Sequence, residues 1–162
     1  MIHVLFVCLG NICRSPMAEA IFAQQVTHAG LDQKISWDSA GTANYHPGKK
    51  PDHRTLQVLT AHGIETAHRA RQITDQDFER FELMLAMDQS NFNDLQRRAE
   101  ALRREGYALK ARIEKMGTYE PQQPVVRDVP DPYYGDLKDF EAVYQMLEPA
   151  CAELLQQLQA RT

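Results

Sequence analysis

The opening segment of the chain constrains its fold more than any other feature. Ile2 to Cys8 is a run of β-branched, aliphatic and aromatic residues without a formal charge, which is typical of a buried central strand in a parallel sheet. The run ends at Gly10-Asn11, two residues that tolerate left-handed backbone conformations. Ser15-Pro16 then predicts a helix start, with serine as the N-cap and the helix continuing over Met17–Ala29. The segment therefore predicts strand, tight loop and helix.

Strands and helices alternate along the rest of the chain, which favours an α/β fold with a parallel sheet and helices on both faces. Pro149 should kink or restart the last helix, and the proline-containing stretch 125–135 is a loop. The further elements that we expect are strands at Ile35–Ala40, Leu83–Met87 and Ala111–Met116, helices at Asp52–His62, Gln89–Arg104 and Leu137–Leu158, and a short helix opened by a capping box at Thr74–Asp77.

Composition excludes several classes of protein. The 162 residues, 43% hydrophobic and 25% charged, suit one domain over 1–162. A net charge of −4 argues against nucleic-acid binding, and no apolar run approaches the roughly 20 residues that span a bilayer. Three cysteines, an odd number, argue against a secreted disulfide scaffold and favour a cytoplasmic protein. The six histidines show no metal-ligand spacing, so we expect no metal site.

The loop between the first strand and the first helix carries the residues for anion chemistry. Its backbone N–H groups, from Leu9, Gly10, Asn11, Ile12 and Cys13 to Arg14 and Ser15, are expected to form an anion-binding nest at the positive end of the helix. Arg14 offers a planar fork that fits two phosphate oxygens. In this field we expect Cys8 to be a thiolate, with the Ser15 hydroxyl donating to its sulfur. A lone cysteine after a strand would be a packing residue, but this loop favours a nucleophile.

A thiolate beneath an anion cradle indicates covalent phosphoryl transfer, in which Cys8 attacks phosphorus. The departing oxygen then needs a proton, and Asp131, between two prolines in the long loop, is the candidate acid. The same carboxylate would activate the water that cleaves the phosphocysteine. Tyr133 and Tyr134 follow it and are expected to wall a slot for an aromatic ring.

The Cys-x5-Arg-Ser loop and the later Asp-Pro-Tyr-Tyr segment together resemble the low-molecular-weight protein tyrosine phosphatases. The resemblance covers nearly the whole chain and implies three layers with a four-stranded parallel sheet, and no metal or organic cofactor. It implies that Asn11 holds the loop through hydrogen bonds to Ser39 and His68, and that Asp88 also supports the site. It further implies a redox role for Cys13, which in this family can form a disulfide that protects the nucleophile.

The expected substrates are tyrosine-phosphorylated proteins, a kinase among the candidates, and the expected state is a monomer or weak dimer. Tyr45 is expected at the pocket wall, and Tyr45, His46 and residues 49–52 are expected to form the rim that sets partner choice. Three alternatives stay open: an arsenate reductase, which would need further relay cysteines; a phosphoarginine phosphatase, whose family members have Thr and Phe where this chain has Ile12 and Tyr133; and a phosphotyrosine-binding module, which would be expected to lack Cys8 or Asp131.

Overall fold

A computed structural model describes residues 1–162. Its centre is a four-stranded sheet in the order β2-β1-β3-β4, and every neighbouring pair of strands is parallel. The strands are β1 (Ile2–Cys8), β2 (Ile35–Gly41), β3 (Leu83–Ala86) and β4 (Arg112–Lys115). The predicted parallel sheet is confirmed, with the first strand of the chain lying between two others.

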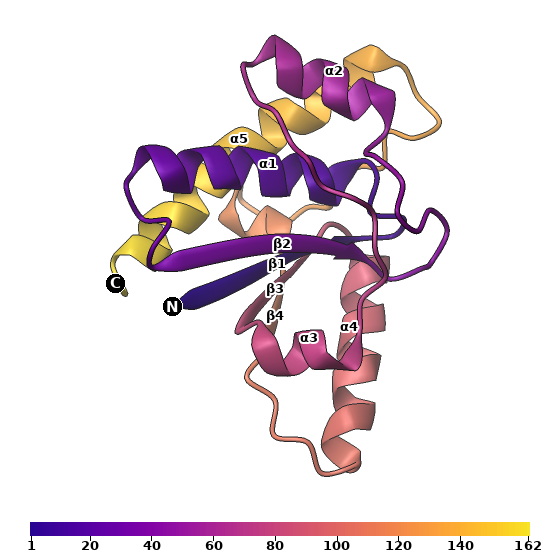
Figure 1. Cartoon of the computed structure of the whole chain (residues 1–162), viewed down its shortest axis with the longest axis vertical. Coiled ribbons are helices and arrows are strands. Elements are labelled where there is room, and N and C mark those ends of the chain that lie inside the picture. The colour runs from indigo at the N-terminus through magenta and orange to yellow at the C-terminus, as the bar shows by residue number, and fades with distance from the viewer.

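Helices cover both faces of the sheet, as expected, so the molecule has three layers (Figure 1). One face carries the first, second and last α-helices, and the other carries the two helices that flank β3 in sequence. The helices are α1 (Arg14–His28), α2 (His53–Ala61), α3 (Asp75–Arg80), α4 (Gln89–Arg104) and α5 (Leu137–Gln159), and a short 3-10 helix, η1, spans Met116–Tyr119.

The central strand separates two apolar cores because successive side chains of a strand point to opposite faces. Val4, Phe6 and Cys8 belong to the larger core, which contains the buried faces of α1 and α5. Leu5 and Val7 belong to the smaller core beneath α3 and α4. The alternation places the Cys8 side chain on the α1 side of the sheet, at the carboxyl end of the strand.

Two details of the helices differ from expectation. Helix α1 begins at Arg14 with Cys13 as its N-cap residue, so the prediction of Ser15 as N-cap is wrong. The Ser15 hydroxyl is occupied instead by contacts with Cys8 and Asn11 inside the first turn. Helix α5 runs without interruption through Pro149, so of the two expected outcomes, a kink or a restart, the restart does not occur. Buried residues on both sides of the proline pack against α1, and this packing keeps the two halves in one helix.

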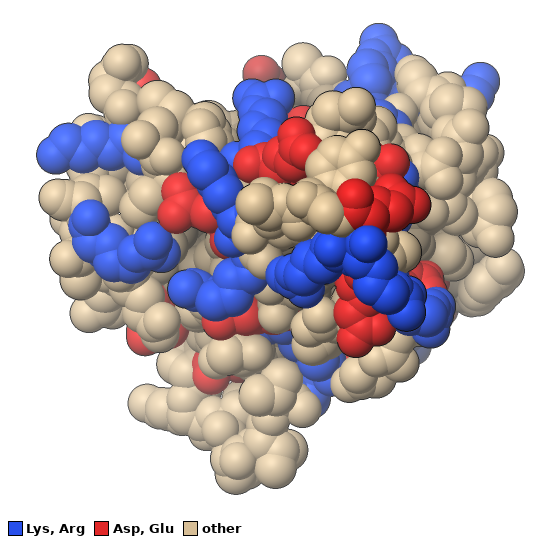
Figure 2. Space-filling model, turned by 90° about the horizontal axis from the view of Figure 1, so that it is seen from below, with Lys and Arg blue, Asp and Glu red and all other residues tan.

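The outer face of α3 and α4 is charged with both signs. Seen from below the view of Figure 1, lysine and arginine side chains are interspersed with aspartate and glutamate (Figure 2). Arg97 pairs with Asp94, and Arg98 pairs with Asp75. The arginines of α4 therefore belong to a mixed, solvated surface. Separately, none of the helices is long and apolar enough to cross a membrane.

Candidate active site

The cysteine that the sequence predicts as the nucleophile lies where β1 ends. Cys8 is only 3% exposed, and its Sγ lies 3.0 Å from the Ser15 Oγ. Both residues belong to regular structure: Cys8 is the last residue of the central strand, and Ser15 lies in the first turn of α1. A hydroxyl at this distance can donate to a sulfur anion.

The backbone N–H groups of the connecting loop have no acceptor within the protein. None of the N–H groups from Leu9 to Ser15 donates a hydrogen bond to a backbone or side-chain atom, although Asn11, Cys13, Arg14 and Ser15 are buried. Buried N–H groups are nearly always paired in proteins. Such a row of free donors at a helix N-terminus, where the helix dipole is positive, suits an oxyanion.

Asn11 fixes the shape of this loop from inside. It is fully buried and adopts a positive φ of 57°, a left-handed conformation that asparagine tolerates better than most residues. Its Nδ2 donates to Ser15 Oγ at 2.8 Å and to Ser39 Oγ at 3.0 Å. Its Oδ1 accepts from the Arg71 backbone N–H at 3.0 Å and contacts His68 Nε2 at 2.7 Å. Four partners therefore hold one side chain.

The end of β2 also presses against the loop. Gly41 lies so close to it that a Cβ at this position would stand 2.7 Å from the Leu9 carbonyl oxygen and 3.2 Å from the Asn11 nitrogen. Both neighbours are backbone atoms, which cannot turn away as a side chain can. The close approach requires glycine here.

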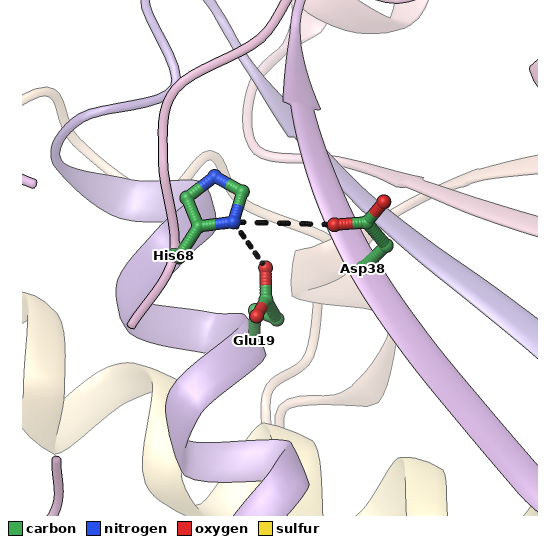
Figure 3. A group of neighbouring side chains, drawn as sticks. All are labelled: Glu19, Asp38 and His68. Carbon is green, nitrogen blue, oxygen red and sulfur yellow. Dashed lines mark ion pairs between the residues drawn. The ribbon is translucent and has the colours of Figure 1, made fainter. Parts of the chain in front are cut away.

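His68 connects the loop to two carboxylates (Figure 3). The Arg71 N–H identifies Asn11 Oδ1 as an acceptor, so His68 Nε2 carries a proton and donates to it. The other ring nitrogen, Nδ1, faces Glu19 at 3.1 Å and Asp38 at 3.9 Å. His68 therefore links Asn11 to Glu19 of α1 and to Asp38 of β2.

The same group offers one ligand atom each from Glu19, Asp38 and His68, all within 4.8 Å of one another, which is a spacing that a metal ion could use. The carboxylates already have other partners. Glu19 accepts from the Ser39 hydroxyl at 2.7 Å, and Asp38 pairs with Arg71 at 3.1 Å. Ion pairs account for the arrangement without a metal.

Arg14 lies at the junction of three segments. Its side chain is 3% exposed, and one terminal nitrogen donates to Asp88 Oδ2 at 2.8 Å and to the Val129 carbonyl at 2.9 Å. The other terminal nitrogen lies 3.7 Å from Asp131 Oδ2. Burial alone would lower the pKa of Arg14, but the facing Cys8, Asp88 and Asp131 outweigh it and raise that pKa. The guanidinium stays charged.

Asp131 lies at the rim, on the loop that follows the last strand. Its side chain is 42% exposed, and its Oδ1 accepts the Tyr133 backbone N–H at 3.1 Å. That turn leaves Oδ2 on the side of Arg14. The carboxyl group therefore combines a fixed direction with access to water.

These residues enclose one cavity of about 270 Å³. Its base is the cysteine loop and Arg14, and its walls are largely aromatic, so it suits a phosphate at the bottom and an apolar ring above. Tyr45, Tyr133 and Tyr134 all line it, as does His46, which was expected at its rim. The full lining is Cys8, Leu9, Gly10, Ile12, Cys13, Arg14, Tyr45, His46, Asp131, Tyr133 and Tyr134.

A second cysteine lines the same cavity. Burial is the main cause that raises the pKa of Cys13 well above its usual value, and the negative charge of the nearby Asp52 is the second. This residue is therefore a thiol at neutral pH. Cys151 is fully buried on α5, away from this cavity, and packs in the larger core.

Sequence reasoning missed several residues that hold the site. Glu19 reaches the loop through His68 and Ser39, and the Val129 carbonyl binds Arg14. Arg54 contacts the segment around Tyr133. A charged residue on the inner face of α1 was a possible signal for Glu19, since buried charges are usually paired. Backbone carbonyls such as that of Val129 leave no signal in the residue type.

Comparison with known proteins gives a consistent result. The family model described as low molecular weight phosphotyrosine protein phosphatase matches residues 3–162. The pig protein of that name is 44% identical over 155 residues, which covers 96% of this chain and 94% of the pig protein.

Two solved structures are similar over nearly their whole length. A protein tyrosine phosphatase from Entamoeba histolytica, crystallised with Hepes in its active site, superposes with a TM-score of 0.88 at 37% identity and covers 99% of this chain and 98% of its own. An arginine phosphatase from Drosophila gives a TM-score of 0.88 at 36% identity and covers 96% of each chain.

Proposed function

The chain belongs to the low molecular weight phosphotyrosine protein phosphatase family, and we propose that it hydrolyses phosphotyrosine in proteins through a phosphocysteine on Cys8. The observation that carries this proposal is that the N–H groups from Leu9 to Ser15, in the loop that joins Cys8 to α1 and lines the same cavity, have no acceptor in the protein. These donors, with Arg14 beside them, are arranged for the equatorial oxygens of a phosphoryl group.

In the first step, the ionised sulfur of Cys8 attacks phosphorus, so that a sulfur–phosphorus bond forms while the bond to the phenolic oxygen breaks. Asp131 donates its proton to that oxygen, which leaves as the neutral phenol of tyrosine. Arg14 keeps its geometry during the step because Asp88 and the Val129 carbonyl bind one of its terminal nitrogens, while the other terminal nitrogen faces Asp131.

In the second step, water attacks the phosphorus of the phosphocysteine. Asp131, now ionised, accepts a proton from that water, and the sulfur leaves as a thiolate. Ser15 supports this departure because its hydroxyl, 3.0 Å from the sulfur, donates to the developing negative charge. Inorganic phosphate is the product, and the starting protonation states are restored.

The cavity wall favours an aryl phosphate over phosphoarginine, the alternative raised by the Drosophila relative. Ile12 and Tyr133 present apolar surface above the loop. A phosphorylated guanidino group carries N–H donors that this surface does not satisfy, and an unsatisfied polar group is costly to bury. A phenyl ring, in contrast, has no polar group that packing against this apolar surface would leave unsatisfied.

We further propose that Cys13 protects the nucleophile. Both cysteines line one cavity, so a sulfenic acid on Cys8 can condense with the Cys13 thiol to a disulfide and release water. A thiol reductant then restores the enzyme. The matching test is brief peroxide treatment followed by reductant, in which a Cys13→Ser variant should recover less activity than the unaltered protein.

The central experiment compares the protein with a Cys8→Ser variant. The unaltered protein should release phosphate from a phosphotyrosine peptide without added metal, and rapid quenching should trap a phosphorylated enzyme. Cys8→Ser should retain below about 0.1% of the activity, since it removes the nucleophile. Residual activity of several per cent would contradict the covalent route. A phosphoarginine peptide, assayed in parallel, should be a poor substrate.

A further inference from the structure

We infer that Arg54 is a positioning residue for the general acid, a role that rests on the proposed function of Asp131. Arg54 lies in the first turn of α2, far from β1 and from the cysteine loop in sequence, and it is not part of the cavity lining. Its side chain crosses to the loop that carries Asp131 and contacts that loop at two points.

The two contacts bracket the end of the turn. One terminal nitrogen of Arg54 donates to the Tyr133 carbonyl at 3.0 Å, and the other donates to the Gly135 carbonyl at 2.9 Å. The guanidinium carbon also lies 4.3 Å from the centre of the Phe140 ring in α5. One side chain thus joins α2, the acid-bearing turn and the helix that follows it.

The direction of Arg54 is itself fixed. Asp52, the N-cap of α2, accepts from Arg54 Nε at 3.0 Å and from a terminal nitrogen at 3.0 Å, and it also accepts the Arg54 backbone N–H at 2.9 Å. This bidentate pair needs the planar fork of arginine. A lysine would have neither the two-point grip on Asp52 nor enough directed donors for both carbonyls.

The contacts lead directly to the carboxyl group of Asp131. The Tyr133 residue whose carbonyl Arg54 holds also donates its N–H to Asp131 Oδ1 at 3.1 Å. The other carboxyl oxygen then faces Arg14 at 3.7 Å. Without Arg54, the exposed turn would lose its two links to α2, and the acid would spend less time aimed at the departing oxygen.

The test uses Arg54→Lys and, as a second variant that lacks the charge, Arg54→Gln. Each is assayed with phenyl phosphate, whose leaving group needs a proton, and with 2,4-dinitrophenyl phosphate, whose leaving group does not. Misplacement of a catalytic group by about 1 Å can cost on the order of a hundredfold. We expect kcat/KM, which reports only the steps up to formation of the phosphocysteine, to fall roughly ten- to hundredfold with phenyl phosphate and less than about twofold with the dinitrophenyl ester.

Arg98→Lys is the matched control. Arg98 also pairs with a carboxylate, Asp75 at 2.9 Å, donates to a backbone carbonyl, that of Ile73 at 3.2 Å, and lies over a phenylalanine ring, Phe78 at 5.9 Å. These contacts join α4 to α3 and to the residues just before α3, outside the cavity lining. Arg98→Lys should leave the rates with both substrates unchanged.

Inhibition by inorganic phosphate serves as a readout of the cysteine loop. It should be the same in the Arg54 variants and in the unaltered protein, because their loop and Arg14 remain in place. Weaker inhibition would overturn the inference, since it would place Arg54 in phosphate binding or in the general stability of the pocket. Equal losses of kcat/KM with both esters would overturn it as well.

An Asp131→Asn background separates this inference from the proposed function. If Asp131→Asn and Arg54→Lys each discriminate between the two esters, and Arg54→Lys adds no further discrimination in the Asp131→Asn background, the inference is supported; further discrimination in that background would overturn it. If Asp131→Asn discriminates but Arg54→Lys alone does not, only the inference fails. If Asp131→Asn itself lowers both esters equally, the acid role of Asp131 fails and the inference fails with it.

Discussion

The cysteine loop and the acid-bearing segment line the same cavity but are fixed in different ways. The loop around Asn11 is buried, and its side-chain contacts come from α1, β2 and the segment before α3. The segment from Arg127 to Gly135 is mostly exposed and has no regular structure. Its backbone is hydrogen-bonded to the rest of the protein near its two ends, at Val129 on one side and through Arg54 on the other. Ion pairs of Arg127, Asp128 and Asp131 add to these contacts.

The difference matches the two tasks that we propose for these regions, phosphate binding and proton transfer. A phosphate-binding loop must present many donors at fixed positions, because each misplaced donor weakens the stabilisation of the transition state. A residue that gives and takes one proton needs a defined direction and access to water, and a peptide substrate must pass it to enter. Burial suits the first task, and an exposed segment with held ends suits the second.

Arg14→Lys should have the largest effect because Arg14 touches both regions. Lysine has no planar fork, so it cannot bind Asp88, the Val129 carbonyl and a phosphate together. We expect kcat/KM to fall about 10²- to 10³-fold with every aryl phosphate. Steady-state kinetics on a leaving-group series would measure it, and a loss confined to poor leaving groups would assign Arg14 to the acid-bearing segment alone.

Asn11→Ala should follow, with an effect on stability as well as on rate. The substitution removes four hydrogen bonds from a buried site and leaves alanine at a positive φ. Unsatisfied buried groups cost about 1–3 kcal/mol each, with partial relief by relaxation. We expect the free energy of unfolding in urea to fall by about 3–4 kcal/mol. A fall below 1 kcal/mol would show that the loop is held elsewhere.

Two glycines allow each region to be disturbed separately. A Cβ at Gly41 would meet the Leu9 carbonyl oxygen at 2.7 Å, and a Cβ at Gly117 would overlap the Arg127 carbonyl oxygen. Each Gly→Ala change should destabilise the protein by about 1–3 kcal/mol, as overpacking does. Gly41→Ala should slow all aryl phosphates equally, whereas Gly117→Ala should slow phenyl phosphate more than the dinitrophenyl ester. The reverse pattern would contradict the division between the two regions.

The smallest expected effect concerns pH and the held end of the acid-bearing segment. Burial alone would raise the pKa of Asp52, but its hydrogen bonds from Arg54 outweigh burial and lower the pKa. A lowered folded-state pKa stabilises the protein above the ordinary aspartate value of about 3.9, and this stabilisation is lost as pH falls through the lower value. The contribution should be at most about 1 kcal/mol, as for a partly exposed pair.

Urea unfolding of the unaltered protein and of Asp52→Asn, at pH 6 and at pH values below 4, would measure it. The difference in stability between the two proteins should shrink as the pH falls below about 4. A difference that stays constant with pH would show that Asp52 acts only through uncharged contacts.

Much of this arrangement was accessible from the sequence. The alternation of strands and helices predicted the layers, and the apolar run at Ile2–Cys8 predicted the central strand, because both depend on local patterns. The cysteine loop was also accessible, since its residues are contiguous. The start of α1 was misplaced because the Ser15 hydroxyl contacts Cys8 and Asn11, and contacts of that kind override a capping preference.

The supports of the acid-bearing segment were not accessible. Arg54 binds carbonyl oxygens at Tyr133 and Gly135, which every residue type possesses, and the contact spans a long stretch of chain. An arginine near a helix start is by itself typical of a solvated surface. Only the three-dimensional arrangement distinguishes it from Arg98, which makes the same kinds of contact elsewhere.

The position of the Arg14 side chain has a consequence for protein engineering. The guanidinium of Arg14 binds Asp88, the N-cap of α4, and also the Val129 carbonyl of the acid-bearing segment. These two parts therefore cannot be exchanged one at a time between relatives. A chimera that carries a new 127–135 stretch to change substrate preference must keep the position of the carbonyl oxygen at residue 129. Otherwise Arg14 is displaced and the activity that depends on Cys8 is lost.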